Sequence, residues 1–406
     1  MIPDLSTRRS LQSHIAAPRI ETPFHPRIAA LSETNDWYTW SGYKAAHSVF
    51  DEELEYFAIR STAALFDISP MVKYRIAGPD AERYLNRLTV RNVAKLAIGR
   101  VQYTAWCDDH GHVLDDGTLF RLAADTFRLC CQERHLPWLL DSAIGFTVDI
   151  EEETTRIAGL ALQGPTAFAV LSKAGFEGME RLKPFQLAEY AHEGGPVTVS
   201  RTGFTGDLGY EIFVSAEHAI SLWDRLWTAG QTHGIRAIGY AALNRARIEA
   251  GFIVANADFM TAETALRADR ARLPDEIGLD WLVDAEKPFF NGRHAILEAR
   301  RNQTLKHMLV GLEIEGNIPA EGAIVYHRKK HEAGLVSAAI WSPLAKRNIA
   351  IATLERPYGS RFIDDLWVEI YASRELQYQK MMKRARIVPR PFIKLDRRTA
   401  TPPGLF

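Results

Sequence analysis

The sequence predicts an α+β protein that ends in a smaller antiparallel β domain. A strand–Gly-Pro–helix pattern occurs twice in the first half of the chain, at residues 73–88 and 159–174. From about residue 305, short alternating strands separated by Gly, Pro and Asn replace the helical periodicity. With 406 residues, the chain is long enough for two or three domains.

The composition excludes several classes of protein. A formal net charge of −1 lacks the basic excess of a nucleic-acid binder. No apolar run approaches the roughly 18 residues of a membrane span, and the N-terminal segment has no apolar region typical of a secretory signal. The three cysteines form no C-x-x-C pair, so we expect neither a disulfide framework nor a metal site built on cysteine. We therefore expect a cytoplasmic protein without nucleic-acid or membrane partners.

The first elements follow from local patterns. The first thirty or so residues are polar and contain three prolines, which predicts an extended arm. Residues 51–68 predict a helix, because apolar residues recur near helical spacing and acids crowd the first turn. In the two repeats, Gly permits the turn and Pro fixes the start of the helix. The repeats indicate a duplicated α+β unit, although two unrelated strand–helix turns would give the same pattern.

The remaining elements complete the predicted order. Residues 100–122 and 125–134 predict a β-meander with a turn at Asp109-His110-Gly111. Residues 218–234 and 240–251 predict two helices, each closed by Gly. Five short strands between residues 307 and 372 predict the C-terminal β domain. We place the boundary between a region at 1–303 and a domain at 304–406, and interpret the basic run at 380–390 as a solvated strand face.

Two acidic features are candidates for chemistry. Asp115 and Asp116 are neighbours in a predicted strand, so one should face the core or a cleft and the other water, unless both lie at a solvated edge. Glu211 lies in an apolar strand after the Gly-rich stretch "SRTGFTGDLGYEIFV". A buried carboxylate there costs several kcal/mol unless it is paired. The N–H groups of a pterin-like ring, Arg201 or Arg247 could supply that pairing.

These motifs together resemble a known family. "SRTGFTGDLGYEI" is close to the S-R-T-G-Y-T-G-E-x-G-x-E signature of the glycine-cleavage aminomethyltransferases, or T-proteins. Further segments are similar to that family in the same order along the chain: "TPFHPRI", "LFDISPMVKYRIAGPDA", "GHVLDDGTLFRL", "RIEAG", "IGLDWLVD", "GLEIEGNIPAEGAIVY" and "WSPLAKRNIAIA". The resemblance implies a three-domain cloverleaf with ferredoxin-like α+β units, a C-terminal β-barrel and a central tetrahydrofolate site.

The resemblance also implies roles for individual residues. Asp116 corresponds to the family's central acid, which would orient the folate and stabilise positive charge on it. Glu211 corresponds to the pterin anchor. Tyr103 also falls on or near a pocket position, and Tyr103 or a histidine near the site is the candidate acid for an ether donor, which needs one. The other positions that the resemblance assigns to the folate site are Met71, Gln132, Phe204, Arg247 and Trp281. It implies tetrahydrofolate as cofactor and no metal.

Departures from the family pattern bear on the substrate. Pro70 replaces the family's His in S-H-M, and Leu243 stands where an Arg is expected to bind the folate tail, which leaves Arg245 or Arg247 to substitute. An aromatic segment at residues 37–43 could form a wall for a methylated donor or belong to the core. These departures resemble tetrahydrofolate-dependent demethylases, which imply methyl transfer from a small sulfonium, methoxy-aromatic or N-methyl donor to folate N5, giving 5-methyltetrahydrofolate.

Two alternatives remain open. One is an aminomethyltransferase of a glycine-cleavage system, which would need a lipoyl carrier protein as partner. The other is a non-enzymatic folate-binding module like the iron–sulfur assembly proteins of this fold. Their K-G-C-Y-x-G-Q motif is replaced here by "SRTGFTGDLGYE".

Overall fold

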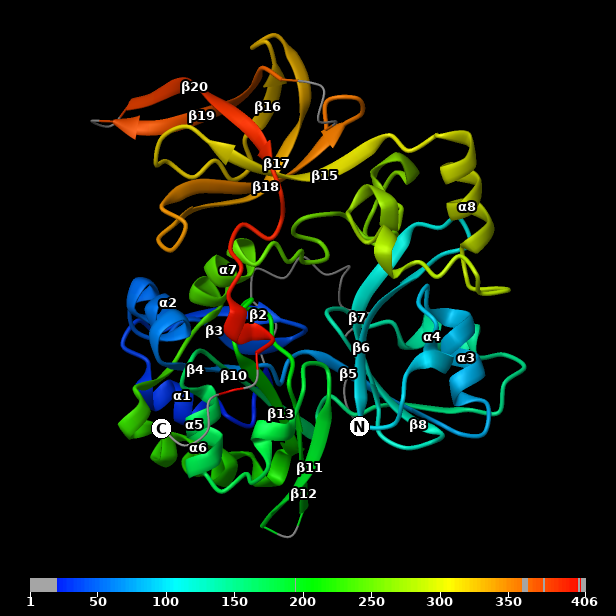
Figure 1. The fold of residues 1–406 in the computed structure, drawn as a ribbon, viewed down its shortest axis with the longest axis vertical. Helices are drawn as coiled ribbons and strands as arrows, with labels where there is room; N and C mark the ends of the chain where they lie inside the picture. The colour runs from blue at the N-terminus through cyan, green and yellow to red at the C-terminus, as the bar shows by residue number, and fades with distance from the viewer. Residues whose placement is uncertain (1–19, 194, 360–363, 375–376, 401, 403–406) are drawn as a thin grey trace.

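The computed structural model describes residues 20–193, 195–359, 364–374, 377–400 and 402. Three lobes surround a common centre: the C-terminal barrel at the top of Figure 1, a sheet with helices at lower left, and a second sheet with helices at lower right. This arrangement confirms the predicted α+β class with its C-terminal barrel. The first nineteen residues of the predicted arm lie outside the described residues.

The first lobe is built on a six-stranded sheet in the order β11-β12-β13-β10-β4-β14. Its apolar core lies between the sheet and α1, α5 and α6, and includes Phe168 and Trp223. The strands are β4 (Ala63–Asp67), β10 (Ile157–Gln163), β11 (Leu187–His192), β12 (Gly195–Ser200), β13 (Gly209–Ser215) and β14 (Ile235–Ala237). The helices are α1 (His25–Leu31), α5 (Ala167–Lys173) and α6 (Ala219–Gly230).

The second lobe is built on a five-stranded sheet in the order β6-β7-β8-β5-β9. Consecutive antiparallel pairing of β6, β7 and β8 confirms the predicted meander. The strands are β5 (Val72–Ala77), β6 (Arg100–Cys107), β7 (Val113–Arg121), β8 (Thr126–Cys131) and β9 (Asp149–Glu152), and the helices are α3 (Ala81–Leu88) and α4 (Leu136–Ser142).

The two Gly-Pro repeats open equivalent units in the two lobes. β5 leads to α3 through Gly78, and β10 leads to α5 through Gly164. Both glycines have a positive φ, of 134° and 120°. A Cβ at Gly78 would lie 2.6 Å from a backbone oxygen, and one at Gly164 would lie 2.4 Å from another, so each turn needs glycine.

A smaller sheet and two helices join the lobes to the barrel. The sheet has the order β1-β3-β2. Its strands are β1 (Ile20–Glu21), β2 (Asp36–Trp40) and β3 (Tyr43–Ser48), and the helices beside it are α2 (Glu52–Ser61) and α7 (Tyr240–Glu249). Figure 1 shows α7 directly below the barrel and α8 (Arg293–Asn302) at its side.

The C-terminal lobe is a closed barrel in the order β15-β18-β17-β16-β19-β20. Its strands are β15 (His307–Ile314), β16 (Ile324–His327), β17 (His331–Ser342), β18 (Arg347–Glu355), β19 (Leu366–Arg374) and β20 (Gln377–Val388). The barrel shares one apolar core with the meander: Ile340, Ile349 and Ile351 cluster with Val90 and Val113. It is therefore packed against the rest of the chain.

Three local predictions need correction. The helix predicted over 51–68 ends at Ser61, because the apolar run that follows is the buried strand β4, which pairs with β10 and β14. The predicted arm contains α1, which begins at His25 with Pro26 in its first turn. The C-terminal domain has a sixth strand, β20, beyond the five predicted; the basic run at 380–390 falls largely on this strand, whose residues are mostly exposed or partly exposed, so its interpretation as a solvated strand face is confirmed.

Candidate functional site

Asp115 and Asp116 lie near the start of β7 and point to opposite faces of its sheet, as strand alternation predicts. Asp115 is fully buried and Asp116 is half-buried. The Asp116 carboxylate accepts a hydrogen bond from the Tyr103 hydroxyl at 2.7 Å. Neither acid belongs to a solvated edge pair, so that alternative is wrong. Asp116 and Tyr103 form the centre of the candidate site.

The environment of Asp116 favours its neutral form. Burial raises the pKa of Asp116 to about 7, and the nearby charge of Asp115 adds to this effect. Burial also raises the pKa of Tyr103 well above its ordinary value. Tyr103 therefore remains a hydrogen-bond donor at neutral pH, while Asp116 can gain or lose a proton near neutrality. This is the property required of a general acid or base.

The buried partner of Asp115 was not foreseen from the sequence. His135 Nε2 lies 3.0 Å from the Asp115 carboxylate, and His135 Nδ1 lies 3.1 Å from Glu263. Sequence reasoning missed His135 because a lone histidine between a strand and a helix has no motif. The one available signal was the predicted meander, whose last strand ends just before residue 135 and lies beside the strand of the acidic pair.

The Gly-rich stretch positions Glu211 on β13. The Glu211 side chain is half-buried, and it accepts a hydrogen bond from the Thr202 hydroxyl at 2.5 Å. Burial raises the pKa of Glu211. Within the described residues no cation lies at ion-pair distance from this carboxylate, because Arg201 bonds to backbone carbonyls and Arg247 pairs with Asp258. Glu211 can therefore accept further N–H donors from a ligand.

Contacts between the two sheets bring Glu211 and Asp116 to one region. Phe120 of β7 and Phe213 of β13 meet edge to face, with ring centroids 5.5 Å apart. Cys130 of β8 pairs with β7 two positions beyond Asp116; burial raises the pKa of its thiol, and the nearby charge of Glu211 adds to this effect. Two polar groups far apart in the sequence thus lie around one junction between the lobes.

Aromatic and basic groups border Tyr103. The exposed Trp281 ring contacts the Tyr103 ring, with ring centroids 6.1 Å apart. The Arg91 guanidinium lies over the same Trp281 ring, 5.7 Å from its centroid. Arg390, which follows β20, donates to the Gly251 carbonyl at 3.2 Å, and its charge favours ionisation of Tyr103. Among the described residues no carboxylate forms an ion pair with Arg390. Arg390 is thus a partly buried cation of this site, with the charge of Asp258 nearby.

The predicted replacements for the missing Arg at Leu243 are both engaged. Leu243 is buried in the core between the lobes. Arg245 pairs with Glu52 at 2.5 Å, and the buried Arg247 pairs with Asp258 at 2.5 Å. Arg247 also donates to a backbone carbonyl. The structure thus places Arg247 in an internal ion pair, and its role in folate binding stays a prediction.

Of the remaining predicted site residues, Met71 lies at this junction, and Gln132 and Phe204 have other contacts. Met71 packs against the core that contains Phe120 and Phe213, and the backbone carbonyl of Gln132 accepts the Ser41 hydroxyl at 3.0 Å. Phe204 stacks on Phe252 with ring centroids 5.2 Å apart. Their contacts with a folate stay predictions.

The predicted aromatic segment contributes to this junction in part. Trp40 stacks over Phe66 at 6.3 Å and packs against the core that joins the lobes. Tyr38 contacts Tyr240 of α7 at 5.1 Å. Trp37 instead packs on the ring of His25, with ring centroids 4.7 Å apart, and not near Asp115 and Asp116. The segment therefore serves as core at one end and borders the junction at the other.

The donor set of the site suits a pterin. The half-buried Glu211 carboxylate, which accepts the Thr202 hydroxyl, has the chemistry to accept a pair of ring N–H groups, and the Arg390 guanidinium, which donates to the Gly251 carbonyl, has the chemistry to donate to a carboxylate. In the described part of the chain, no group of three His, Cys, Asp or Glu residues could hold a metal ion.

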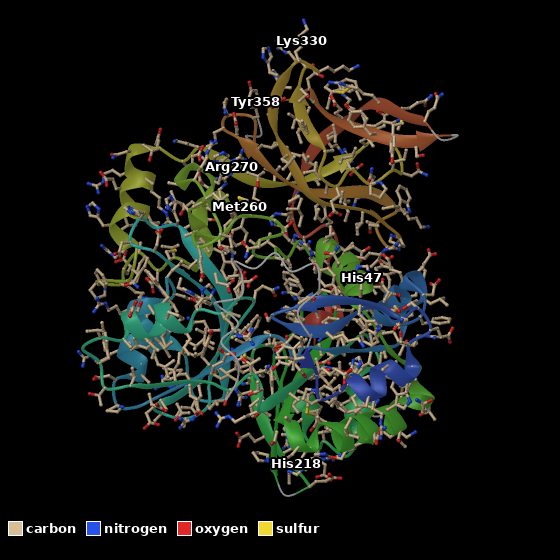
Figure 2. All side chains as sticks on the ribbon, turned by 180° about the vertical axis from the view of Figure 1, so that it is seen from behind. His47, His218, Met260, Arg270, Lys330 and Tyr358 are labelled. Atoms are coloured by element: carbon tan, nitrogen blue, oxygen red, sulfur yellow. The ribbon has the colours of Figure 1, made fainter. Side chains whose placement is uncertain are left out.

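The described helices include none that is both long and apolar enough to cross a membrane. In Figure 2, Met260 and Arg270, from the segment after α7, lie beside the lower part of the barrel.

Comparisons with known proteins agree with the geometry. Residues 25–287 match the GCVT N-terminal domain, and residues 307–394 match the glycine cleavage T-protein C-terminal barrel domain. A solved structure of glycine cleavage system aminomethyltransferase T from Bartonella henselae covers 93% of this chain and 99% of its own, with a TM-score of 0.80 and 24% identity. This structure shares the fold.

Curated relatives extend the match. An aminomethyltransferase of Caldanaerobacter subterraneus is 33% identical over 75% of this chain and 80% of its own. A trimethylamine-oxide aldolase of Ruegeria pomeroyi is 35% identical over 82% of this chain. The matched region is only 43% of that aldolase, so this chain corresponds to less than half of it.

Proposed function

Because the chain belongs to the glycine cleavage T-protein family, we propose that it is a folate-dependent enzyme that transfers a one-carbon unit to tetrahydrofolate. The single observation that supports this most is the pairing of Asp116 with Tyr103 at the junction of the lobes. A carboxyl whose pKa is raised to about 7 beside a neutral hydroxyl suits proton transfer at neutral pH.

The residues divide between holding the folate and reacting. Glu211 accepts hydrogen bonds from the pterin ring, and Arg390 binds the carboxylate at the other end of the cofactor, replacing the arginine absent at position 243. Tetrahydrofolate supplies the nitrogen that receives the one-carbon unit. Asp116 takes up the proton that this nitrogen releases and stabilises positive charge there. Tyr103 holds the Asp116 carboxylate in place by its hydrogen bond.

Two donors are consistent with this site. The names of the relatives favour an aminomethyl group, as in a glycine-cleavage system, where a lipoyl carrier protein would deliver it. A demethylase acting on a small methylated compound is the second candidate. Pro70 and Leu243 depart from the family pattern, and one relative is named for trimethylamine oxide, a methylated amine derivative. The aromatic pair of Tyr38 and Tyr240 could contact such a donor.

The folate product distinguishes the candidates. We would incubate the protein with tetrahydrofolate and either an aminomethylated lipoyl carrier or a panel of N-methyl, sulfonium and methoxy-aromatic compounds. Methylenetetrahydrofolate from the first donor identifies an aminomethyltransferase, and 5-methyltetrahydrofolate from the second set identifies a demethylase. Folate binding without any product would contradict the proposal and identify a non-enzymatic folate-binding module.

A further inference from the structure

A line of polar contacts joins Asp116 to the protein surface through Asp115. One Asp115 carboxylate oxygen accepts the backbone N–H of Asp116 at 2.8 Å. The other accepts the backbone N–H of Glu133 at 3.1 Å and lies 3.0 Å from His135 Nε2. On the far side of the ring, Nδ1 lies 3.1 Å from Glu263, whose side chain is 54% exposed.

The contacts of His135 select its charged form. A neutral imidazole has one N–H, whereas both ring nitrogens of His135 face a carboxylate, so the imidazolium alone donates to both. Burial by itself lowers the pKa of His135, but the hydrogen bonds and charges of Asp115 and Glu263 outweigh it and raise the pKa to about 9. A positive charge is thus fixed beside a fully buried carboxylate.

Packing holds the His135 ring in this orientation. The ring meets the edge of Trp106, with centroids 5.7 Å apart and planes at 86°. The backbone N–H of His135 donates to the Tyr74 hydroxyl at 2.8 Å. The His135 side chain is 1% exposed, so the ring has no space to turn toward solvent.

We propose that His135 is a positioning residue of the candidate site: its cation, clamped between Asp115 and Glu263, holds the Asp115 carboxylate against the backbone of Asp116 and sets the charge beside that acid. The proposal rests on the proposed function only in giving Asp116 a catalytic role. Apart from Asp115, the titratable and charged groups near Asp116 among the described residues include Tyr103 of β6, Cys131 of β8, Asp258 from the segment after α7, and Arg390 beyond β20, whose charge acts on Tyr103 and Asp258.

Removal of this cation should change how Asp116 titrates. Without His135, the acids Asp115 and Asp116 would lie together with no imidazolium to offset their charge, whereas Asp258 would keep its ion pair with Arg247. A lost positive charge favours the protonated forms of nearby carboxyls. Asp116 should then release its proton at higher pH than in the native protein.

The test follows the carboxyl carbons of aspartate by NMR in full-length protein labelled with ¹³C at Cγ. Loss of one signal in Asp116→Asn identifies Asp116. We expect His135→Gln to move its titration midpoint to higher pH by about one pH unit or more. Glu263→Gln changes an exposed side chain and leaves the core intact. It should move the midpoint of Asp116 in the same direction, but by less. His192→Gln removes another buried histidine, which bonds Ser221 on the first lobe, and should leave the midpoint unchanged.

The outcomes separate this proposal from the proposed function, because the titration needs neither folate nor turnover. A midpoint that stays in place or moves to lower pH in His135→Gln and Glu263→Gln would overturn the positioning role, even in an active enzyme. Should His135→Gln fail to fold, Glu263→Gln alone decides. A raised midpoint supports the role, even where no folate product forms. In an active enzyme, the acidic limb of the pH–rate profile should move with the midpoint, which a purely structural role would not produce.

Discussion

At the scale of single residues, the two neighbouring acids of β7 have different surroundings and should respond differently to the same change. Asp116→Asn keeps the size of the side chain and removes its charge. We expect folate binding near the native level and turnover reduced by about 10²-fold or more, because an acid–base and electrostatic contribution is lost. Single-turnover measurements at saturating folate would check this. Native turnover in a folded Asp116→Asn protein would place the chemistry elsewhere.

The raised pKa of Asp116 also predicts an effect of pH on stability. A carboxyl whose pKa is about 7 when folded and about 3.9 when unfolded binds its proton more tightly in the folded state. Its stabilising contribution is complete below the unfolded pKa and is lost as pH rises through about 7. Asp116→Asn should therefore be more stable than the native protein at pH 8, by about 1–3 kcal/mol, and nearly equal at pH 4. Urea unfolding at both pH values would measure this, and equal stability at pH 8 would contradict it.

Glu211 should matter for binding rather than for chemistry. Glu211→Ala removes the acceptor for the pterin N–H groups, and we expect folate affinity to fall by about 1–3 kcal/mol. Thr202 would lose its partner too, so Thr202→Val is the matched control that removes the same internal hydrogen bond and keeps the carboxylate. Calorimetric titration with tetrahydrofolate compares the two. An affinity unchanged in a folded Glu211→Ala protein would refute the assignment.

Sequence patterns indicated the acids of the site better than the groups that surround them. Strand alternation placed Asp115 and Asp116 on opposite faces, and the Gly-rich motif identified Glu211. His135 and Arg390 have no local pattern, because each reaches the site through long-range pairing of strands or packing of the barrel. Arg247 matched the expected helix, yet the acid that engages it, Asp258, lies in a loop whose course no periodicity predicts.

At the scale of elements, glycines fix the path of the stretch before β13. The amide of the buried Gln163 lies between Gly203 and Gly209, and added Cβ atoms there would come within 2.1 Å and 2.2 Å of it. That amide accepts the Thr205 hydroxyl at 2.9 Å and so ties the loop to β10. The spacing of the glycines therefore serves to bring the loop close to a neighbouring strand.

Gly209→Ala should disturb this packing and the carboxylate two residues further on. We expect a loss of about 1–3 kcal/mol of stability from overpacking, together with weaker folate binding. Gly195→Ala is the matched control, since its Cβ would approach nothing closer than 3.4 Å on β12. Urea unfolding and folate titration of both variants would measure the effects. Equal behaviour of the two variants would show that the Gln163 contact does not fix the strand.

Element types were predictable where the pattern was long or repeated. The two strand–Gly-Pro–helix units and the meander follow directly from alternation and turn residues. The helix predicted over 51–68 extended too far because a fully buried strand, β4, shows no alternation: all five of its residues are buried. A short apolar run that directly follows a helix is easily predicted as a continuation of that helix, because the sequence does not show the strands with which it pairs.

At the scale of the whole molecule, ionic contacts fasten the chain after the barrel to the first lobe. Arg397 bonds the buried Asp207 at 2.5 Å, and Asp207 also pairs with Arg60 of α2 at 3.3 Å. Arg60 in turn pairs with Glu249 of α7 at 2.8 Å, and Ser342 of the barrel bonds the same carboxylate. One buried network thus links the Gly-rich loop, two helices and the barrel.

The division of the chain at residue 303 should therefore not yield an independent enzyme. Removal of the barrel would strip Ile340, Ile349 and Ile351 from the core that they share with Val90 and Val113 of the second lobe. It would also leave Arg60 and Asp207 without the arginine that completes their network, and would remove Arg390 from the site. Each buried aliphatic side chain contributes about 1.5–3 kcal/mol, so the loss of three of them is already comparable to the 5–15 kcal/mol stability of a typical domain, and the loss of the ionic network adds to it.

We expect residues 1–303 to bind a hydrophobic dye, to lack a cooperative thermal transition and to show no folate turnover. Adding the barrel region as a separate chain should restore little, because the shared core must form while both parts fold. The control is full-length protein cleaved after folding within the segment joining α8 to β15, which keeps every buried contact and should retain activity. A soluble, cooperatively folded and active 1–303 fragment would show instead that the barrel is an appendage, and that Arg390 has no part in holding the folate.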